Sequence, residues 1–240
     1  MFNVDVDVII IGETWLKHDN TFLYSIPGYI FSCRDSSHGG LAMYVSHKIK
    51  KKVISNIVSG GCHYIHLEMT VSGYRFDLIG IYRPPSYNFE EFQDLLESIM
   101  SNSNRNRPCF IAGDVNVPIN LCYNNIVVRY KHLLESYGFV CTNTIPTRPA
   151  SNNVLDHFVA KSNEAFRIRN DTIFNTESDH LQIISSVNLN LGKDRQILTK
   201  NIVDREKLKN MFNDYINRIV HVDDVEGCFS DIISTYNSML

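Results

Sequence analysis

The chain has 240 residues, a mass of 27.6 kDa and a formal net charge of −3. With 44% hydrophobic and 20% charged residues, its composition is that of a globular protein and excludes an intrinsically disordered chain. The slightly acidic balance gives no sign of a generally basic nucleic-acid-binding protein. The length allows one large domain or two small ones.

The six cysteines form no CxxC pair and no short cysteine–histidine spacing, so a zinc site is not expected. The sequence has no basic segment followed by an apolar signal region. It also has no apolar run of about 18 residues that could span a membrane. We therefore expect an intracellular protein with reduced thiols that is neither secreted nor inserted in a membrane.

The sequence is rich in predicted strands through about residue 190. Residues 4–11 are apolar except for two aspartates, which predicts a central strand buried on both faces. Shorter strands are expected at residues 41–45, 64–70 and 75–82. Ser72 and Gly73 suit a hairpin turn between the last two of these strands. The lysines between the first two are expected at a solvated hairpin tip and are Lys48, Lys50, Lys51 and Lys52.

The period of the apolar residues changes near Asn88. Asn88 and Glu91 fit a helix N-terminus, and the apolar residues that follow at helical spacing are Phe89, Phe92, Leu95, Leu96 and Ile99. A buried strand is expected at 109–112 and a second helix at 127–137, which Gly138 ends. Further strands are expected at 154–159 and 182–189. Many strands with few helices predict a layered sandwich of α and β elements.

The composition changes after residue 191. Residues 192–200 are polar and are interpreted as a linker, and an amphipathic helix is expected from Asp204, with a second short helix at 225–239. We therefore expect one domain over residues 1–191. Residues 192–240 would be a linker and the helical start of a following region.

Acidic and polar residues recur where predicted strands end, and loops at strand ends converge on clefts in layered proteins. These residues are Glu13, Asp114, Asn116, Asp156, Asp179 and His180. Several carboxylates that share one cleft need a cation to remain ionised. Oxygen ligands without cysteine favour Mg²⁺ or Mn²⁺ over zinc.

Six short sequence motifs occur in a fixed order, and together they are far more specific than any one of them alone. The motifs are Glu13-Thr14-Trp15-Leu16, Gly39-Gly40-Leu41-Ala42, Ile81-Tyr82-Arg83-Pro84-Pro85, Gly113-Asp114-Val115-Asn116, Leu155-Asp156-His157 and Ser178-Asp179-His180. Together they resemble the endonuclease/exonuclease/phosphatase superfamily, and more narrowly the apurinic-type endonuclease domain of non-LTR retrotransposons. The resemblance covers roughly residues 4–189. It implies an α+β fold, the four-layer αββα sandwich of DNase I-like proteins.

The resemblance also implies a role for each matched residue. The implied catalytic residues are Tyr82, Asp114, Asn116, Asp156 and His180; the implied metal ligands are Glu13 and Asp179. The implied substrate-binding residues are Arg83, Thr147, Arg148 and Ser178. Asp114 would activate the attacking water, and Asp156 would keep His180 cationic at the scissile phosphate.

Each of these residues has an ordinary structural interpretation as well. Asp114 could form an Asx turn after a glycine, and Glu13 could cap a turn. His180 could be a hydrogen-bonded core histidine, and Tyr82 a buried aromatic at a strand end. Asp156 could make a structural hydrogen bond with its neighbour. The six motifs in order favour the functional interpretation over these alternatives.

The sequence departs from the family pattern in one main respect. Members of the family begin with a strand that carries an asparagine of the site, before the glutamate motif. This sequence starts only a few residues before Glu13, so we expect that strand to be missing. The chain would then be an N-terminally truncated fragment of a longer reading frame, or a degenerate copy.

These observations predict a Mg²⁺-dependent (or Mn²⁺-dependent) endonuclease that nicks DNA by phosphodiester hydrolysis. One alternative is a catalytically impaired retroelement remnant that acts only as a nucleic-acid-binding or interaction module. Another is a phosphatase of the same superfamily. The expected partners are DNA and a downstream reverse-transcriptase domain in the parent reading frame, with activity on DNA in the nucleus.

Overall fold

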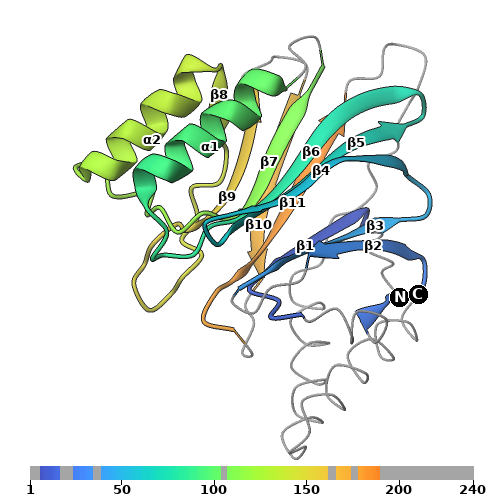
Figure 1. The fold of residues 1–240 in the computed structure, drawn as a ribbon, viewed down its shortest axis with the longest axis horizontal. Coiled ribbons are helices and arrows are strands. Elements are labelled where there is room, and N and C mark those ends of the chain that lie inside the picture. The colour runs from blue at the N-terminus through green and yellow to red at the C-terminus, as the bar shows by residue number, and fades with distance from the viewer. Residues whose placement is uncertain are drawn as a thin grey trace, which may run out of the picture.

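A computed structural model describes residues 6–16, 24–34, 39–103, 107–161, 166–173 and 178–189. Within these ranges the chain forms eleven strands in three sheets and two helices (Figure 1). The linker and helices expected over residues 192–240 lie outside the described residues.

A mixed six-stranded sheet forms the centre of the fold, with the strand order β4-β5-β6-β7-β9-β8. Its strands are β4 (Lys50–Ser59), β5 (Cys62–Val71), β6 (Tyr74–Tyr82), β7 (Cys109–Asp114), β8 (Phe139–Cys141) and β9 (Asp156–Lys161). Only β6 and β7 pair in parallel, because a helix joins them; the other neighbours are antiparallel. The hairpin predicted at Ser72 and Gly73 is confirmed, and their φ values of 50° and 83° suit a tight turn.

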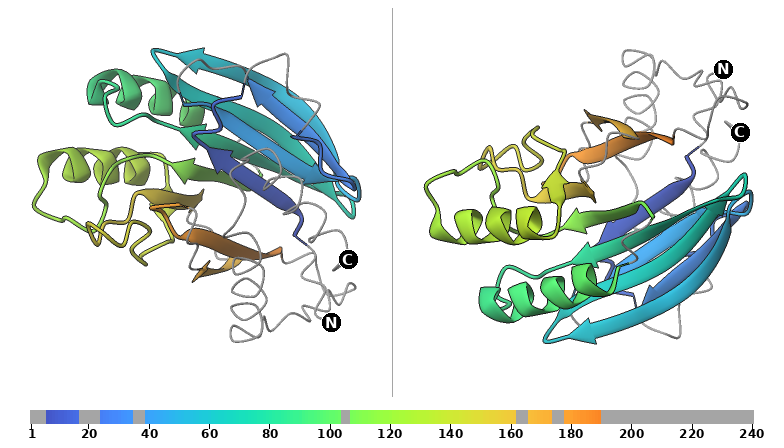
Figure 2. Two further views of the ribbon diagram at one scale, coloured as in Figure 1. Left: turned by 90° about the horizontal axis from the view of Figure 1, so that it is seen from below. Right: turned by 90° about the horizontal axis from the view of Figure 1, so that it is seen from above.

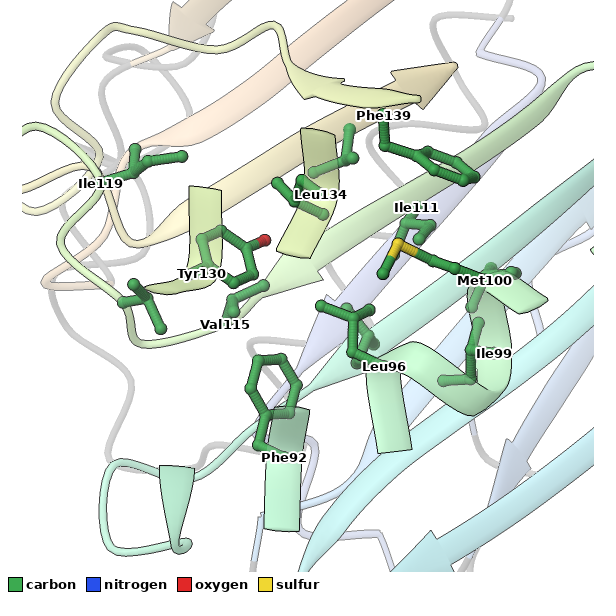
Figure 3. Packing of buried hydrophobic residues seen from close by; sticks show 14 of the residues in the cluster. Phe92, Leu96, Ile99, Met100, Ile111, Val115, Ile119, Tyr130, Leu134 and Phe139 are labelled. Carbon is green, nitrogen blue, oxygen red and sulfur yellow. The ribbon is translucent and has the colours of Figure 1, made fainter. Parts of the chain in front are cut away.

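Two helices, α1 (Phe89–Asn102) and α2 (Asn125–Ser136), cover one face of this sheet (Figure 2). Asn88 caps α1 as predicted, since its side chain accepts hydrogen bonds from the amides of Glu90 and Glu91. The apolar residues of both helices pack on the sheet in one core (Figure 3). Among them are Phe92, Leu96, Ile99, Met100, Tyr130 and Leu134. The periodicity of the sequence therefore located both helices, although α2 begins two residues before the predicted start.

The opposite face of the six-stranded sheet packs against a second layer of strands (Figure 2). This layer contains the three-stranded sheet β1-β3-β2 and the hairpin β10-β11. Its strands are β1 (Val8–Gly12), β2 (Tyr29–Arg34), β3 (Leu41–Ser46), β10 (Phe166–Ile173) and β11 (Gln182–Leu189). The prediction of a strand buried on both faces near the start of the chain was wrong for β1. Every residue of β1 is only half-buried, and among the described strands it pairs with β3 alone.

The predicted α+β fold class is confirmed. The described residues contain one helical layer and two strand layers of the expected four-layer sandwich. In this part of the chain, neither helix has the length and apolar character needed to cross a bilayer.

Candidate active site

Two aspartates from neighbouring strands meet at one end of the six-stranded sheet. Asp114 ends β7 and Asp156 begins β9, and the two residues are direct partners in the antiparallel ladder. Asp114 lies on the same face of β7 as Phe110, and Asp156 lies on the same face of β9 as Phe158. The side chains of both phenylalanines fill the core between the two strand layers. Both carboxylates therefore point toward the open end of that core.

His180 completes the cluster from the segment that precedes β11. Its Nδ1 lies 2.7 Å from the Oδ2 of Asp156. One ligand atom from each of Asp114, Asp156 and His180 lies within 4.8 Å of the other two. The hydrogen bond to Asp156 raises the pKa of His180 and outweighs the opposing effect of burial, so the imidazole tends to be cationic.

Asp114 is held by Asn116 in a tight turn. The backbone amide and the side-chain Nδ2 of Asn116 donate to the two carboxylate oxygens of Asp114, at 3.0 and 2.9 Å. The two side chains meet because Asn116 adopts a left-handed φ of 52°. Burial, followed by the nearby Asp156 carboxylate, raises the pKa of Asp114 to about 7.

Glu13 and Tyr82 form a second pair at the same end of the fold. The Tyr82 hydroxyl donates to Oε1 of Glu13 at 3.0 Å. Burial and this hydrogen bond raise the pKa of Tyr82, so the phenol stays protonated. The pair lies close to Asp114, since a Cβ atom at Gly12 would lie 3.3 Å from Cδ2 of Tyr82 and 3.8 Å from Cβ of Asp114. Gly39 fits against the Tyr82 ring, where a Cβ atom would lie 2.4 Å from Cε1.

The sequence profile of the Endonuclease/Exonuclease/phosphatase family matches residues 1–180. The chain belongs to this family. A search of curated protein sequences gives no match. The predicted resemblance is thus confirmed at the level of the family.

Solved structures agree with this membership. The endonuclease domain of TRAS1, a telomere-specific non-LTR retrotransposon, has a TM-score of 0.61 and 13% identity, and the match covers 76% of this chain and 86% of that one. TDP2 of D. rerio, humanized by 14 mutations, has a TM-score of 0.59 and 15% identity, with 76% and 85% covered. The catalytic domain of human Nocturnin has a TM-score of 0.56 and 15% identity, with 76% and 80% covered. At these identities the likeness shows a shared fold.

Two of the predicted substrate-binding residues of this family member are buried. The Arg83 side chain is 6% exposed, and its guanidinium donates to the backbone carbonyls of Val115, Asn116 and Tyr87. Arg83 therefore holds the loop after Asp114, because its donors are directed at the protein's own carbonyls. Its predicted role toward substrate stays a prediction.

Thr147 is completely buried, and its predicted role toward substrate stays a prediction. Its Oγ1 accepts hydrogen bonds from the amides of Leu155 and Asp156, and its carbonyl accepts one from Leu181. Thr147 thus ties the start of β9 to the segment that carries His180. Through its bonds to the amides of Asp156 and Leu181, this buried residue positions the Asp156–His180 pair.

Asp179 does not join the carboxylate cluster in this structure. Its side chain is 63% exposed and forms an ion pair of 2.8 Å with Arg148. The hydroxyl of Ser178 accepts a hydrogen bond from the amide of His180, so it shapes the turn before that residue. The roles predicted for Asp179, Arg148 and Ser178 toward metal and substrate stay predictions.

His157 and Tyr130 support the site and were not predicted to do so. His157 is buried directly behind Asp156; its Nε2 donates to the carbonyls of Val117 and Val154, and its Nδ1 accepts from Tyr130 at 3.0 Å. Burial lowers the pKa of His157 to about 4, so the ring is neutral. The histidine thereby joins helix α2 to the loop that follows Asp114. The position of His157 next to Asp156 in the sequence was the one signal that could have indicated this supporting role.

The side chains present fit a divalent cation. Glu13, Asp114 and Asp156 offer carboxylate oxygens, the ligands that Mg²⁺ and Mn²⁺ prefer. Burial and, after it, repulsion from the Asp156 carboxylate raise the pKa of Asp114, and His180 only partly offsets them. A cation would remove this repulsion, and family members in general use divalent metals.

Proposed function

We propose that this protein is a metal-dependent endonuclease that hydrolyses phosphodiester bonds in DNA. The observation that carries the proposal is the cluster of Asp114, Asp156 and His180, which combines a carboxyl of pKa about 7 with a carboxylate-bound imidazole. The six motifs of the sequence favour the retrotransposon branch of the family. The similar fold of the TRAS1 endonuclease domain supports this choice.

Asp114 would act as the base that takes a proton from the attacking water. Asn116 holds both of its oxygens, which fixes the direction of the carboxyl. A pKa near neutral pH is the optimum for a group that must accept a proton and release it again.

His180 would stabilise charge on the scissile phosphate. Asp156 binds its Nδ1, which leaves Nε2 as the nitrogen that donates to a phosphate or leaving oxygen. Each such electrostatic contact contributes roughly 10²–10³-fold to the rate in comparable sites.

Glu13 would hold the Mg²⁺ or Mn²⁺ ion, beside the two aspartates. The bound cation would neutralise negative charge on the phosphate oxygens. Tyr82, kept protonated, orients the Glu13 carboxylate through its hydroxyl. With DNA as substrate, the protein would act in the nucleus beside a reverse-transcriptase region of the same reading frame.

A plasmid-nicking assay tests the proposal. The purified protein is incubated with supercoiled plasmid in Mg²⁺ or in EDTA, together with the variants Asp114→Ala and Asp94→Ala. Asp94 is an exposed residue of α1, so its variant makes the same change of charge away from the site. We expect nicking by the wild type and Asp94→Ala in Mg²⁺ only, and none by Asp114→Ala.

Other outcomes would point to the alternative functions. Nicking that persists in Asp114→Ala would overturn the assigned mechanism. Metal-independent DNA binding without nicking would favour a remnant that only binds nucleic acid. Hydrolysis of a phosphate monoester without nicking would favour a phosphatase.

A further inference from the structure

Trp15 is the single tryptophan of the chain, and 56% of its surface is exposed. Tryptophan is among the most buried residues on average, because its large apolar surface is costly to hydrate. Its neighbour Leu16 follows that rule and is 7% exposed in an apolar cluster with Ala42 and Tyr44. Leu16 therefore anchors the segment, while the indole of Trp15 remains at the surface.

The backbone that presents Trp15 is strained. Glu13 and Trp15 have φ values of 53° and 51°, in the left-handed region that bulky residues rarely adopt. The amide of Trp15 donates to the carbonyl of Gly39 at 2.7 Å, which fixes this conformation. Strain of this kind persists where the surrounding structure enforces it, and it concentrates at functional sites.

The backbone of Trp15 is linked to the Glu13–Tyr82 pair of the candidate active site. Gly39, which binds its amide, packs on the ring of Tyr82, and the Tyr82 hydroxyl binds Glu13. A Cβ atom at Gly40 would lie 2.4 Å from the hydroxyl oxygen of Thr14, so the glycine pair allows the segment to approach this closely. The exposed indole thus belongs to the residue two positions after the carboxylate assigned to the metal, in a segment held against the site.

We propose that Trp15 stacks on a base of the bound nucleic acid next to the scissile phosphate. This inference rests on the proposed function and deepens it, since it makes the site prefer a nucleic acid with an accessible base over a base-free phosphodiester chain. Stacking on an aromatic side chain tolerates any base sequence, because every base has a π face. The contact would therefore select for the presence of a base without reading its identity.

Intrinsic fluorescence tests the contact directly, because Trp15 is the only tryptophan. The full-chain Asp114→Asn variant, which should not cleave, is titrated in Mg²⁺ with a short single-stranded DNA and with an abasic strand of equal length. We expect the first to quench the indole and the second to leave its emission nearly unchanged. Equal quenching by both strands, or quenching by neither, would overturn the proposal.

Cleavage by Trp15 variants separates stacking from a structural role. Trp15→Leu keeps an apolar side chain without the π face, and Trp15→Phe keeps a smaller aromatic ring. We expect Trp15→Leu to raise KM for the base-containing strand by about tenfold or more. Cleavage of the abasic strand and the melting temperature should not change, and Trp15→Phe should retain part of the preference. If Trp15→Leu slows cleavage of both strands equally or lowers the melting temperature, the indole serves the fold instead.

The two proposals fail in different ways. If the wild type cleaves neither strand and does not nick the supercoiled plasmid, the proposed endonuclease function is wrong, and the fluorescence titration still decides whether Trp15 contacts a base. If the wild type cleaves both strands with the same KM, the function stands and the role of Trp15 is wrong.

Discussion

Asp77 and Asp114 lie on adjacent central strands, β6 and β7, and both are buried, but their surroundings differ in charge. Asp77 is inaccessible to solvent and lies 3.0 Å from Nε of Arg107 and 3.2 Å from Nε2 of His66. Burial alone would raise its pKa, but His66 and Arg107 outweigh burial and hold it below the usual value. Asp114 has another carboxylate beside it, and its pKa is raised to about 7.

The contrast distinguishes a structural cluster from a reactive one. The Asp77 carboxylate is paired with Arg107 of the protein itself, so it can stabilise the fold without a ligand. The Asp114 cluster has excess negative charge at the open end of the core, which costs stability and prepares the site for a cation and a proton. This difference predicts distinct effects on the reaction, on the stability of the fold and on metal binding.

The largest expected effect is on the reaction. Asp114→Asn should slow nicking by about 10³-fold, because the amide cannot take a proton from water. The same change should leave the free energy of unfolding unchanged or raise it, since it removes the repulsion from Asp156. Nicking rates and urea unfolding measure the two effects. A substantial loss of stability in Asp114→Asn would show that the two clusters do not differ as described.

Asp77→Asn should do the reverse. It removes the buried carboxylate that Arg107 and His66 both contact, and we expect a loss of about 3 kcal/mol in the free energy of unfolding. The nicking rate of the folded variant should match that of the wild type. Glu68→Gln is the matched control, because Glu68 pairs with the same arginine from a more exposed position and should matter less. A slower reaction in folded Asp77→Asn would contradict the separation of roles.

Added metal should stabilise the protein through the Asp114 cluster and not through the Asp77 cluster. At a Mg²⁺ concentration of about 100 Kd, binding to the native state adds about 2.7 kcal/mol to the free energy of unfolding. The gain should persist in Asp77→Asn and be reduced in Glu13→Gln and Asp114→Asn. Thermal unfolding with Mg²⁺ or with EDTA measures it. An equal gain in Glu13→Gln would place the ion elsewhere.

The sequence predicted those parts of the fold that depend on local patterns. Helix α1 follows from its Asn88 cap and its apolar periodicity, which are contained within one segment. Strand β4 was missed, because an edge strand exposes apolar residues such as Val53 and Ile57 beside its lysines and shows no clean alternation. The lysines expected at a hairpin tip lie partly within this strand.

The candidate site was predicted only in part, because local patterns in the sequence do not report contacts between distant residues. Strand ends and the family motifs indicated Asp114, Asp156 and His180, which the fold does bring together. The burial of Arg83 depends on carbonyls more than 30 residues away, and no local pattern reports such contacts. The Asp77 cluster was missed because its aspartate lies within an otherwise apolar strand and its arginine follows 30 residues later.

The smallest expected effect concerns His157, the neutral histidine behind the site. Its pKa is about 4 in the folded protein and about 6.5 when unfolded, so the unfolded state binds the proton first as the pH falls. The folded state should therefore lose about 2 kcal/mol relative to the unfolded state between neutral pH and pH 5. His157→Gln cannot titrate in this range, so its free energy of unfolding should fall by correspondingly less.

Asp114 also titrates in this pH range, so the effect of His157 must be measured as a difference between two proteins that both contain Asp114. Without metal its folded pKa lies above the unfolded value, so between pH 7 and 4 it adds stability as the pH falls, opposite to His157. The effect of Asp114 cancels when the free energy of unfolding of His157→Gln is subtracted from that of the wild type. In EDTA, the Asp114→Asn variant should in turn show a steeper loss of stability with acid than the wild type. Parallel curves for these two proteins would mean that Asp114 is ionised in the folded state, and the contrast with Asp77 would disappear.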